Sequence, residues 1–148
     1  IDIIDNYKDQ MGLNENTNVL LLQPTSPLRL KGEIDEIILS FYKTSAKSLI
    51  SVVLSEDVHP ARMYQLSSED FLEAYDSQNQ HLRRQDLNEL YFRDGCYYLT
   101  KVKEIIREKS FFTSPSLAFK RDSELLLNID SKRDFIISHV IMKEYYDY

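Results

Sequence analysis

The residues that could do chemistry gather in one short stretch, Leu20-Leu21-Leu22-Gln23-Pro24-Thr25-Ser26-Pro27-Leu28-Arg29. Its polar members are an amide (Gln23), two hydroxyls (Thr25 and Ser26) and a guanidinium group (Arg29). Such groups donate and accept the hydrogen bonds that hold a small ligand. Pro, Ser and Thr also organise turns, so a structural role for this stretch stays open beside the ligand site that it predicts.

Two predicted elements position this stretch. The apolar run from Val19 to Leu22 predicts a buried strand, and residues 32–42 predict a helix with apolar side chains on one face. The helix carries three carboxylates in its first turn, which suit the positive end of the helix dipole. In open α/β sheets, ligands bind just beyond the carboxyl ends of strands, which is where Gln23 to Arg29 would lie.

The remaining segments predict an alternating α/β organisation. Strands are expected over residues 48–54 and 125–129, and a hairpin is expected over 63–66 and 71–75. Residues 91–99 predict a strand pair, or a strand after a turn at Arg93-Asp94-Gly95. Residues 1–7 are typical of the middle or end of an amphipathic helix. Helices are also expected over 101–108 and from a Ser131–Asp134 capping box to about Tyr145. Alternation of strands and helices favours parallel pairing.

Composition limits the classes of function. The 148 residues suit one domain, and 43% hydrophobic with 28% charged residues is ordinary for a soluble globular protein. A net charge of -6 argues against nucleic-acid binding, which needs a basic surface. No apolar run reaches the roughly 18 to 20 residues that cross a membrane, and no signal peptide opens the chain. The single cysteine, Cys96, indicates a reducing, cytoplasmic location.

Three further motifs follow the first in order along the chain. They are Arg84-Gln85-Asp86-Leu87 with Tyr91 to Leu99, then Phe111-Phe112, then Asn128-Ile129-Asp130-Ser131 with Asp134-Phe135. Together with the string LQPTSPLR, they cover roughly residues 17 to 138. In this order the motifs resemble the acylneuraminate cytidylyltransferases, the enzymes that make CMP-activated sialic acids.

The resemblance implies a fold and a reaction. The fold is a three-layer α/β/α, Rossmann-like domain of the nucleotide-diphospho-sugar-transferase kind. A small extension, expected over about residues 59–84, swaps into the partner of a homodimer. In the reaction, the anomeric hydroxyl of a nine-carbon sugar acid attacks the α-phosphate of CTP, and pyrophosphate leaves. Such chemistry depends on positioning and charge stabilisation, with Mg²⁺ neutralising the phosphates.

The resemblance also gives roles to particular residues. Gln23 matches a glutamine that contacts the sugar. Arg84 matches an arginine that binds the sugar carboxylate across the dimer, and Arg62 stands loosely where another basic residue serves the same acid. Asp130 matches a metal-binding aspartate and, with Arg84, is expected to be catalytic. The other substrate-binding residues implied are Thr25, Ser26 and Arg29 in the loop, and the aromatic Tyr98, Phe111 and Phe112.

The sequence departs from the family pattern in three places. Asn128 stands where the family has the first aspartate of its DxD pair, so either a cation held by Asn128 and Asp130 would bind less tightly or the second carboxylate would come from elsewhere. Asn88 replaces the proline of the RQ-x-LP block, and bulkier residues fill the block that ends at Leu99. The chain's three glycines form no glycine-rich cluster, so we expect the first strand and phosphate loop of such a domain to be missing.

Two hypotheses of different classes follow. The first is CTP-dependent activation of a sialic-acid-type sugar, incomplete in this chain, with legionaminic or pseudaminic acid as other substrates. The second is a non-catalytic remnant that acts as a dimerising or ligand-binding module. The intact motifs favour the first hypothesis, and the lack of a phosphate loop favours the second. A missing first strand would also leave an unpaired sheet edge, which would uncover Ile50, Val52 and Val53 if they lie next to it, and we expect self-association to compensate.

Overall fold

The computed structural model describes residues 4, 6 and 9–146, and these divide into two compact units. The first, here called the sheet unit, comprises the chain up to Val53 and again from Arg93. The second, the hairpin unit, is Leu54–Phe92 and contains the predicted extension over residues 59–84. The helix predicted within residues 1–7 falls largely outside the described residues.

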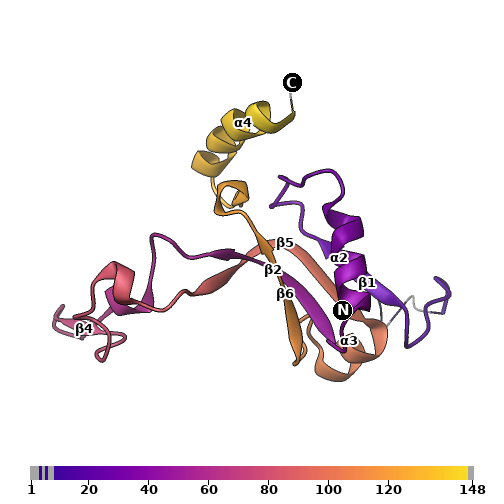
Figure 1. The fold of residues 1–148 in the computed structure, drawn as a ribbon, viewed down its shortest axis with the longest axis horizontal. Coiled ribbons are helices and arrows are strands. Elements are labelled where there is room, and N and C mark those ends of the chain that lie inside the picture. Colours follow the sequence, from indigo (N-terminus) through magenta and orange to yellow (C-terminus); the bar gives the residue numbers. More distant parts are fainter. Residues whose placement is uncertain (1–3, 5, 7–8, 147–148) are drawn as a thin grey trace. The chain divides into compact units, whose positions relative to one another are not determined.

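A mixed sheet, with strand order β1-β5-β2-β6, forms the centre of the sheet unit (Figure 1). The strands are β1 (Asn18–Leu22), β2 (Ser48–Leu54), β5 (Tyr91–Lys101) and β6 (Ser116–Arg121). β2 and β6 are parallel, but β1 and β5 are antiparallel, so parallel pairing is a wrong prediction for that pair. The chain enters β5 from the hairpin unit, without the helical crossover that connects parallel neighbours.

The position of β2 in the sheet shows whether the apolar side chains of this strand lie at a sheet edge. β2 lies between β5 and β6, and its Ile50 and Val53 are buried while Val52 is partly buried. These side chains therefore do not lie beside a sheet edge, and the condition for their exposure is not met.

Two strand predictions also need correction. Residues 91–99 contain no turn at Arg93-Asp94-Gly95, because β5 runs unbroken through Gly95. The strand predicted over 125–129 is instead a 3-10 turn, η3 (Ser123–Leu125), followed by a segment outside the sheet. Leu125 and Leu127 are buried against Leu28, so their alternation with exposed residues reflects packing on a loop rather than strand pairing.

Three helices among residues 9–146 belong to the sheet unit. α2 (Glu33–Tyr42) packs Ile37 and Phe41 against residues of β2 and β5, and α3 (Val102–Glu108) buries Val102 and Ile105. α4 (Lys132–Tyr146) begins at the predicted capping box. There the Ser131 amide donates to Asp134 Oδ2 at 2.8 Å and the Asp134 amide donates to Ser131 Oγ at 3.3 Å. None of the helices described is long and apolar enough to cross a membrane.

The hairpin unit has almost no core of its own. Its strands β3 (Tyr64–Leu66) and β4 (Leu72–Ala74) pair antiparallel, which confirms the predicted hairpin. Two short 3-10 helices, η1 (Pro60–Arg62) and η2 (Arg84–Asp86), complete it. Within residues 54–92, Ala61 is the one buried side chain. An isolated two-stranded hairpin is marginally stable in water, so this unit depends on further contacts.

Candidate functional site

The loop from Gln23 to Arg29 is closed by its own last residue. The Ser26 amide donates to the Gln23 carbonyl at 3.1 Å. Arg29 Nη2 donates to the same carbonyl at 2.7 Å and to the Cys96 carbonyl at 3.3 Å. Arg29, predicted to face substrate, therefore also fixes the shape of the loop and ties it to β5.

A second arginine, which was not among the predicted site residues, also holds the loop in place. Arg121, at the end of β6, has a side chain that is only 2% exposed. Its guanidinium group contacts Glu33 Oε1 at 2.9 Å, Asp94 Oδ2 at 2.8 Å and the Leu28 carbonyl at 2.7 Å. One buried cation thus joins α2, β5 and β6 to the loop.

The aromatic ring of Tyr97 completes this buried network. The Tyr97 hydroxyl donates to Glu33 Oε2 at 2.7 Å, and the Leu30 amide donates to the same oxygen at 2.8 Å. The guanidinium carbons of Arg29 and Arg121 lie 5.6 and 5.4 Å from the Tyr97 ring centroid. Cations over an aromatic face are attracted by the ring quadrupole, so Tyr97 holds both arginines.

Hydrogen bonds and burial shift the pKa values of three groups in this network. Burial alone raises the pKa of Glu33, but hydrogen bonds from Arg121, the Leu30 amide and Tyr97 outweigh it and lower the pKa. Burial lowers the pKa of Arg121, but its bonds to Glu33 and Asp94 raise it overall. Burial and donation to Glu33 raise the pKa of the Tyr97 phenol. Near neutral pH the network therefore pairs the Arg121 guanidinium cation with the Glu33 carboxylate and a neutral Tyr97 phenol.

The loop meets the predicted cation ligands through Ser26. Ser26 Oγ lies 3.2 Å from the Asp94 carbonyl and 3.3 Å from Asn128 Oδ1. Asn128 Nδ2 donates to Asp130 Oδ2, and the Ile129 amide donates to the Thr25 carbonyl at 2.7 Å. The structure thus brings two of the predicted groups together, the loop hydroxyls and the Asn128–Asp130 pair.

Gly95 lets Gln23 and Ser26 approach β5 closely. Its φ is +79°, and a Cβ added there would lie 2.8 Å from Gln23 Oε1 and 3.0 Å from Ser26 Oγ. The first contact is shorter than real Cβ contacts and the second is tight, so a side chain there would push the Gln23 amide or the Ser26 hydroxyl aside, and the positive φ favours glycine. The Gln23 amide can therefore lie close to β5.

The donor set beside the loop suits a weakly held cation. Asn128 and Asp130 are both accessible to solvent, and carboxylate and amide oxygens are ligands that Mg²⁺ accepts. No cluster of three or more His, Cys, Asp or Glu that could hold a metal occurs among the residues described. Mg²⁺ commonly keeps waters and substrate phosphates as its other ligands, so one carboxylate with one amide fits it.

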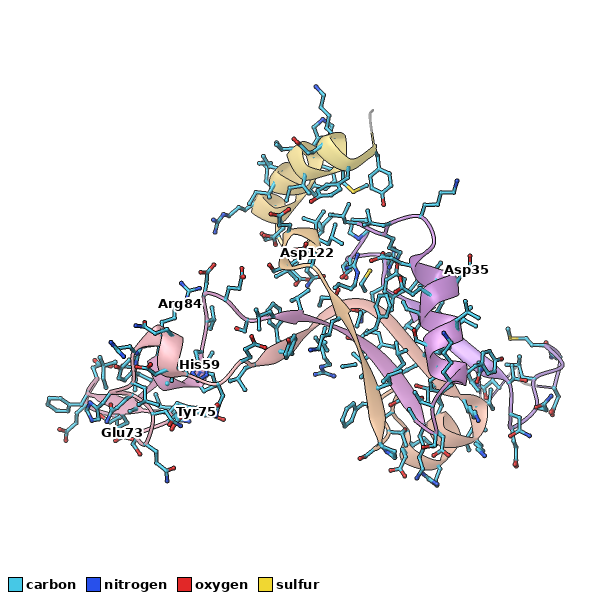
Figure 2. The ribbon with its side chains drawn as sticks, viewed as in Figure 1. Asp35, His59, Glu73, Tyr75, Arg84 and Asp122 are labelled. Atoms are coloured by element: carbon cyan, nitrogen blue, oxygen red, sulfur yellow. The ribbon has the colours of Figure 1, made fainter. Side chains whose placement is uncertain are left out.

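The two remaining predicted basic residues lie in the hairpin unit. Arg84 contacts the Glu56 carbonyl and lies 3.6 Å from Asp57, with its side chain 71% exposed. Arg62 donates to the carbonyls of Gln80 and Leu82. Arg84 and His59, both labelled in Figure 2, line a pocket of about 390 Å³ within this unit.

The predicted aromatic residues do not gather at the loop within this chain. Tyr98 pairs with Leu21 near the Gln23 end of β1 and is partly exposed, while its neighbour Tyr97 is fully buried. Phe111 packs against Val102 and Ile105, and its carbonyl accepts from Thr100, whose strand partner is near the start of β1. Phe112 beside it is 55% exposed.

An apolar groove of about 530 Å³ adjoins the loop on the α4 side. Pro27 and Ile129 form one wall, and residues of α4 form the other: Phe135, Ser138, His139, Met142 and Lys143. Cys96 lies under the loop, with its thiol 3.7 Å from the Ser26 carbonyl and 3.8 Å from the Leu28 carbonyl. Burial raises the pKa of this thiol to about 11.

Sequence comparison identifies the relatives of the chain. No family model matches it. It is 35% identical, over 149 residues, to the N-acylneuraminate cytidylyltransferase of Streptococcus agalactiae serotype V, an alignment that covers 99% of this chain and 33% of the relative. This chain is homologous to the N-acylneuraminate cytidylyltransferases. The predicted resemblance is thereby confirmed, and the chain spans about a third of the length of that relative.

Two further matches widen the comparison beyond that cytidylyltransferase. The CMP-N,N'-diacetyllegionaminic acid synthase of Legionella pneumophila is 31% identical over 137 residues, covering 85% of this chain and 54% of that protein. The crystal structure of 4-diphosphocytidyl-2C-methyl-D-erythritol synthase superposes with a TM-score of 0.60 at 12% identity, covering 95% of this chain and 64% of the other. The second match confirms the predicted α/β nucleotidyltransferase fold.

Proposed function

We propose that the protein carrying this chain activates a nine-carbon sugar acid with CTP. The anomeric hydroxyl attacks the α-phosphorus, the bond to the β-phosphate oxygen breaks, and CMP-sugar and pyrophosphate form. The observation that carries this proposal is the 35% identity to an N-acylneuraminate cytidylyltransferase along 99% of the chain. A loop held by two arginines at the predicted substrate position supports it.

In this proposal the Gln23 loop binds the sugar. The Gln23 amide can donate to one sugar hydroxyl and accept from another, and Thr25 can add a hydroxyl. Because Arg29, Arg121 and Gly95 already fix the loop, little conformational freedom is lost on binding. A geometry fixed in advance is the main resource of phosphoryl-transfer enzymes.

Asp130 and Asn128 would hold a divalent cation beside the loop. Mg²⁺ bound there supplies charge neutralisation for the phosphates. The single carboxylate makes this a weak site until substrate phosphates complete it. Asp134 is committed to the α4 cap, where hydrogen bonds with Ser131 lower its pKa, so it takes no part.

Arg84 would bind the sugar carboxylate from the partner of a homodimer. Its exposed guanidinium group can meet two carboxylate oxygens at once. We expect Arg62 to contribute less to binding the sugar carboxylate, because its guanidinium group already donates to the carbonyls of Gln80 and Leu82. Tyr98, Phe111 and Phe112 remain candidates for lining the sugar and N-acyl pocket. Phe111 and Phe112 could also line the pocket of the partner subunit in a homodimer.

Exposed apolar side chains in the hairpin unit support the homodimer. Leu66, Phe71, Leu72 and Tyr75 are each 64–67% exposed, and Figure 2 labels Tyr75 there. A patch of this kind commonly marks a protein interface. We place the enzyme in the cytoplasm, where CTP is made and where a free cysteine such as Cys96 stays reduced.

Pyrophosphate release is the direct test of the activity. The chain would be assayed with CTP, Mg²⁺ and N-acetylneuraminic acid, alone and with an N-terminal segment from a relative. Legionaminic and pseudaminic acids would be assayed in parallel. Release that needs the added segment is the expected result. Absence of release under every condition would contradict the proposed activity.

Arginine variants test the carboxylate assignment within the same assay. Arg84→Ala should weaken sugar-acid binding about tenfold or more, because a charge-assisted pair is lost. Arg83→Ala, a neighbouring exposed arginine paired with Asp86, serves as the matched control. Equal effects of the two substitutions would remove Arg84 from the carboxylate site.

A second candidate function is a non-catalytic module that dimerises or binds a ligand. The exposed apolar side chains of the hairpin unit favour it, because they suit an interface whether or not the protein catalyses a reaction. Sugar-acid binding without pyrophosphate release, with or without the added segment, would support this candidate.

A further inference from the structure

The Asn128 amide lies between two neighbours, Asp130 and Ser26, and one orientation of the amide serves both. Its Nδ2 donates to Asp130 Oδ2, and its Oδ1 lies 3.3 Å from Ser26 Oγ. Ser26 has one hydroxyl proton and two acceptors within reach, Asn128 Oδ1 and the Asp94 carbonyl at 3.2 Å. In this orientation the Asn128 amide points its N–H at Asp130. Asn128 and Asp130 therefore do not each offer an oxygen to the same cation.

A half-turn of the amide reverses this arrangement without losing a hydrogen bond to Ser26. Asn128 Nδ2 would then donate to Ser26 Oγ, and the Ser26 proton would go to the Asp94 carbonyl. The serine becomes donor and acceptor at once, which a hydroxyl allows. Asn128 Oδ1 would face Asp130 Oδ2, and two oxygens facing each other repel unless a cation lies between them.

We propose that Asn128 turns its amide when a divalent cation binds, and that Ser26 is the positioning residue that makes the turn possible. This rests on the cation role proposed for Asp130. The surroundings favour it, because Ser26 is only 3% exposed and the Asp94 carbonyl beside it is fixed by the buried Asp94–Arg121 pair. Ser26 thus offers its oxygen in one stable place, while Asn128 and Asp130 are reachable from solvent.

Nuclear magnetic resonance of the Asn128 side-chain amide during a Mg²⁺ titration tests the turn in the unaltered chain. Without the ion, its NH₂ protons should show nuclear Overhauser contacts to Asp130; with Mg²⁺ they should shift to Ser26. If the Asp130 amide signal responds to Mg²⁺ but these contacts do not change, the turn is refuted and the cation role stands. If Mg²⁺ changes nothing, both are refuted.

Variants measure the coupling between Ser26 and Asn128. Ser26→Ala should weaken Mg²⁺ binding about tenfold, the usual cost of losing a residue that orients a ligand. Asn128→Asp should tighten binding about tenfold, because it adds a charge and needs no turn. Adding Ser26→Ala to Asn128→Asp should then change affinity less than about twofold, since a carboxylate presents oxygen either way.

Matched controls separate this coupling from general effects. Ser110→Ala removes a serine hydroxyl near Phe112, away from the loop, and Asn14→Asp adds a charge before β1. Neither control should alter Mg²⁺ affinity. If Ser26→Ala costs the same affinity in the unaltered chain as in the Asn128→Asp variant, Ser26 only supports the loop, and the proposal is overturned.

Discussion

In the sheet unit charged side chains are buried and paired, whereas in the hairpin unit large apolar side chains are exposed. Arg121 and Asp94 have side chains that are 2% and 1% exposed, while Phe71 and Leu72 are each 67% exposed. A buried charge keeps its place only when its partners are fixed. An exposed apolar side chain finds its place only when something covers it.

This difference teaches how the two parts of the candidate site acquire their geometry. The sheet unit sets the Gln23 loop through contacts within one chain, from Arg29, Arg121 and Gly95. The hairpin unit, which carries Arg62 and Arg84, has Ala61 as its one buried side chain and would gain its fixed form from a partner. The shape of the Gln23 loop should therefore tolerate dilution of the protein, whereas the shape of the hairpin unit should not.

The largest effect should come from removing the buried cation. Arg121→Met leaves Glu33 and Asp94 buried without their partner and should lower the free energy of unfolding by about 3–5 kcal/mol. Urea unfolding followed by circular dichroism measures it. The contrasting change is Arg83→Ala, whose ion pair with Asp86 is exposed and should contribute no more than about 1 kcal/mol. Similar losses would erase the distinction between the units.

A smaller effect should follow from filling the space beside Gln23. Gly95→Ala should destabilise the protein by about 1–3 kcal/mol through strain and crowding, and should displace Gln23 and Ser26. Gly12→Ala is the control, because Gly12 also has a positive φ, +65°, but has nothing within 4 Å. Thermal unfolding of both variants separates backbone strain from crowding. Equal losses of stability in the two variants would show that crowding does not contribute.

Next in size should be the loss of dimer after a change in the hairpin unit. Leu72→Ser should weaken self-association about tenfold, because it removes an apolar contact from the proposed interface. Light scattering over a dilution series gives the dissociation constant. Leu39→Ser changes a comparably exposed leucine, 59% exposed on α2, and should leave association unchanged. A protein that is monomeric throughout would assign the exposed patch to another partner.

The smallest effect should be a change in pH dependence. Because folding lowers the pKa of Glu33 below its ordinary 4.5, the unfolded chain takes up the proton first as the pH falls. The stabilisation from Glu33 is thus complete above pH 4.5 and is lost as the pH falls through the folded-state pKa. Glu33→Gln should flatten the stability profile below about pH 5, measured by urea titration, whereas Asp35→Asn at the exposed start of α2 should not.

Much of the sheet unit could be predicted from its pattern. The apolar runs of β1 and β2, the amphipathic face of α2 and the Ser131 cap of α4 are local signals, and all four are confirmed. β6 was not predicted because Ser116–Arg121 mixes apolar with basic residues and becomes a strand through its pairing with β2. Local sequence carries little information about such a partner.

The candidate site was predictable in its motifs but not in its support. Gln23, Ser26 and Asp130 stood out by type and spacing, and the structure gathers the loop with the Asn128–Asp130 pair. Arg121 gave no signal, because an arginine in a sequence is ordinarily taken as exposed. Its burial follows from three partners that lie 27 to 93 positions away along the chain.

The thiol beneath the loop gives the chain a built-in chemical reporter. Cys96 is fully buried against the carbonyls of Ser26 and Leu28, and its high pKa keeps it protonated and unreactive in the closed loop. An alkylating reagent can therefore reach it only while the loop is lifted from β5. The rate of alkylation at a single sulfur would time the opening of the loop, and a bound ligand that holds the loop down would slow it.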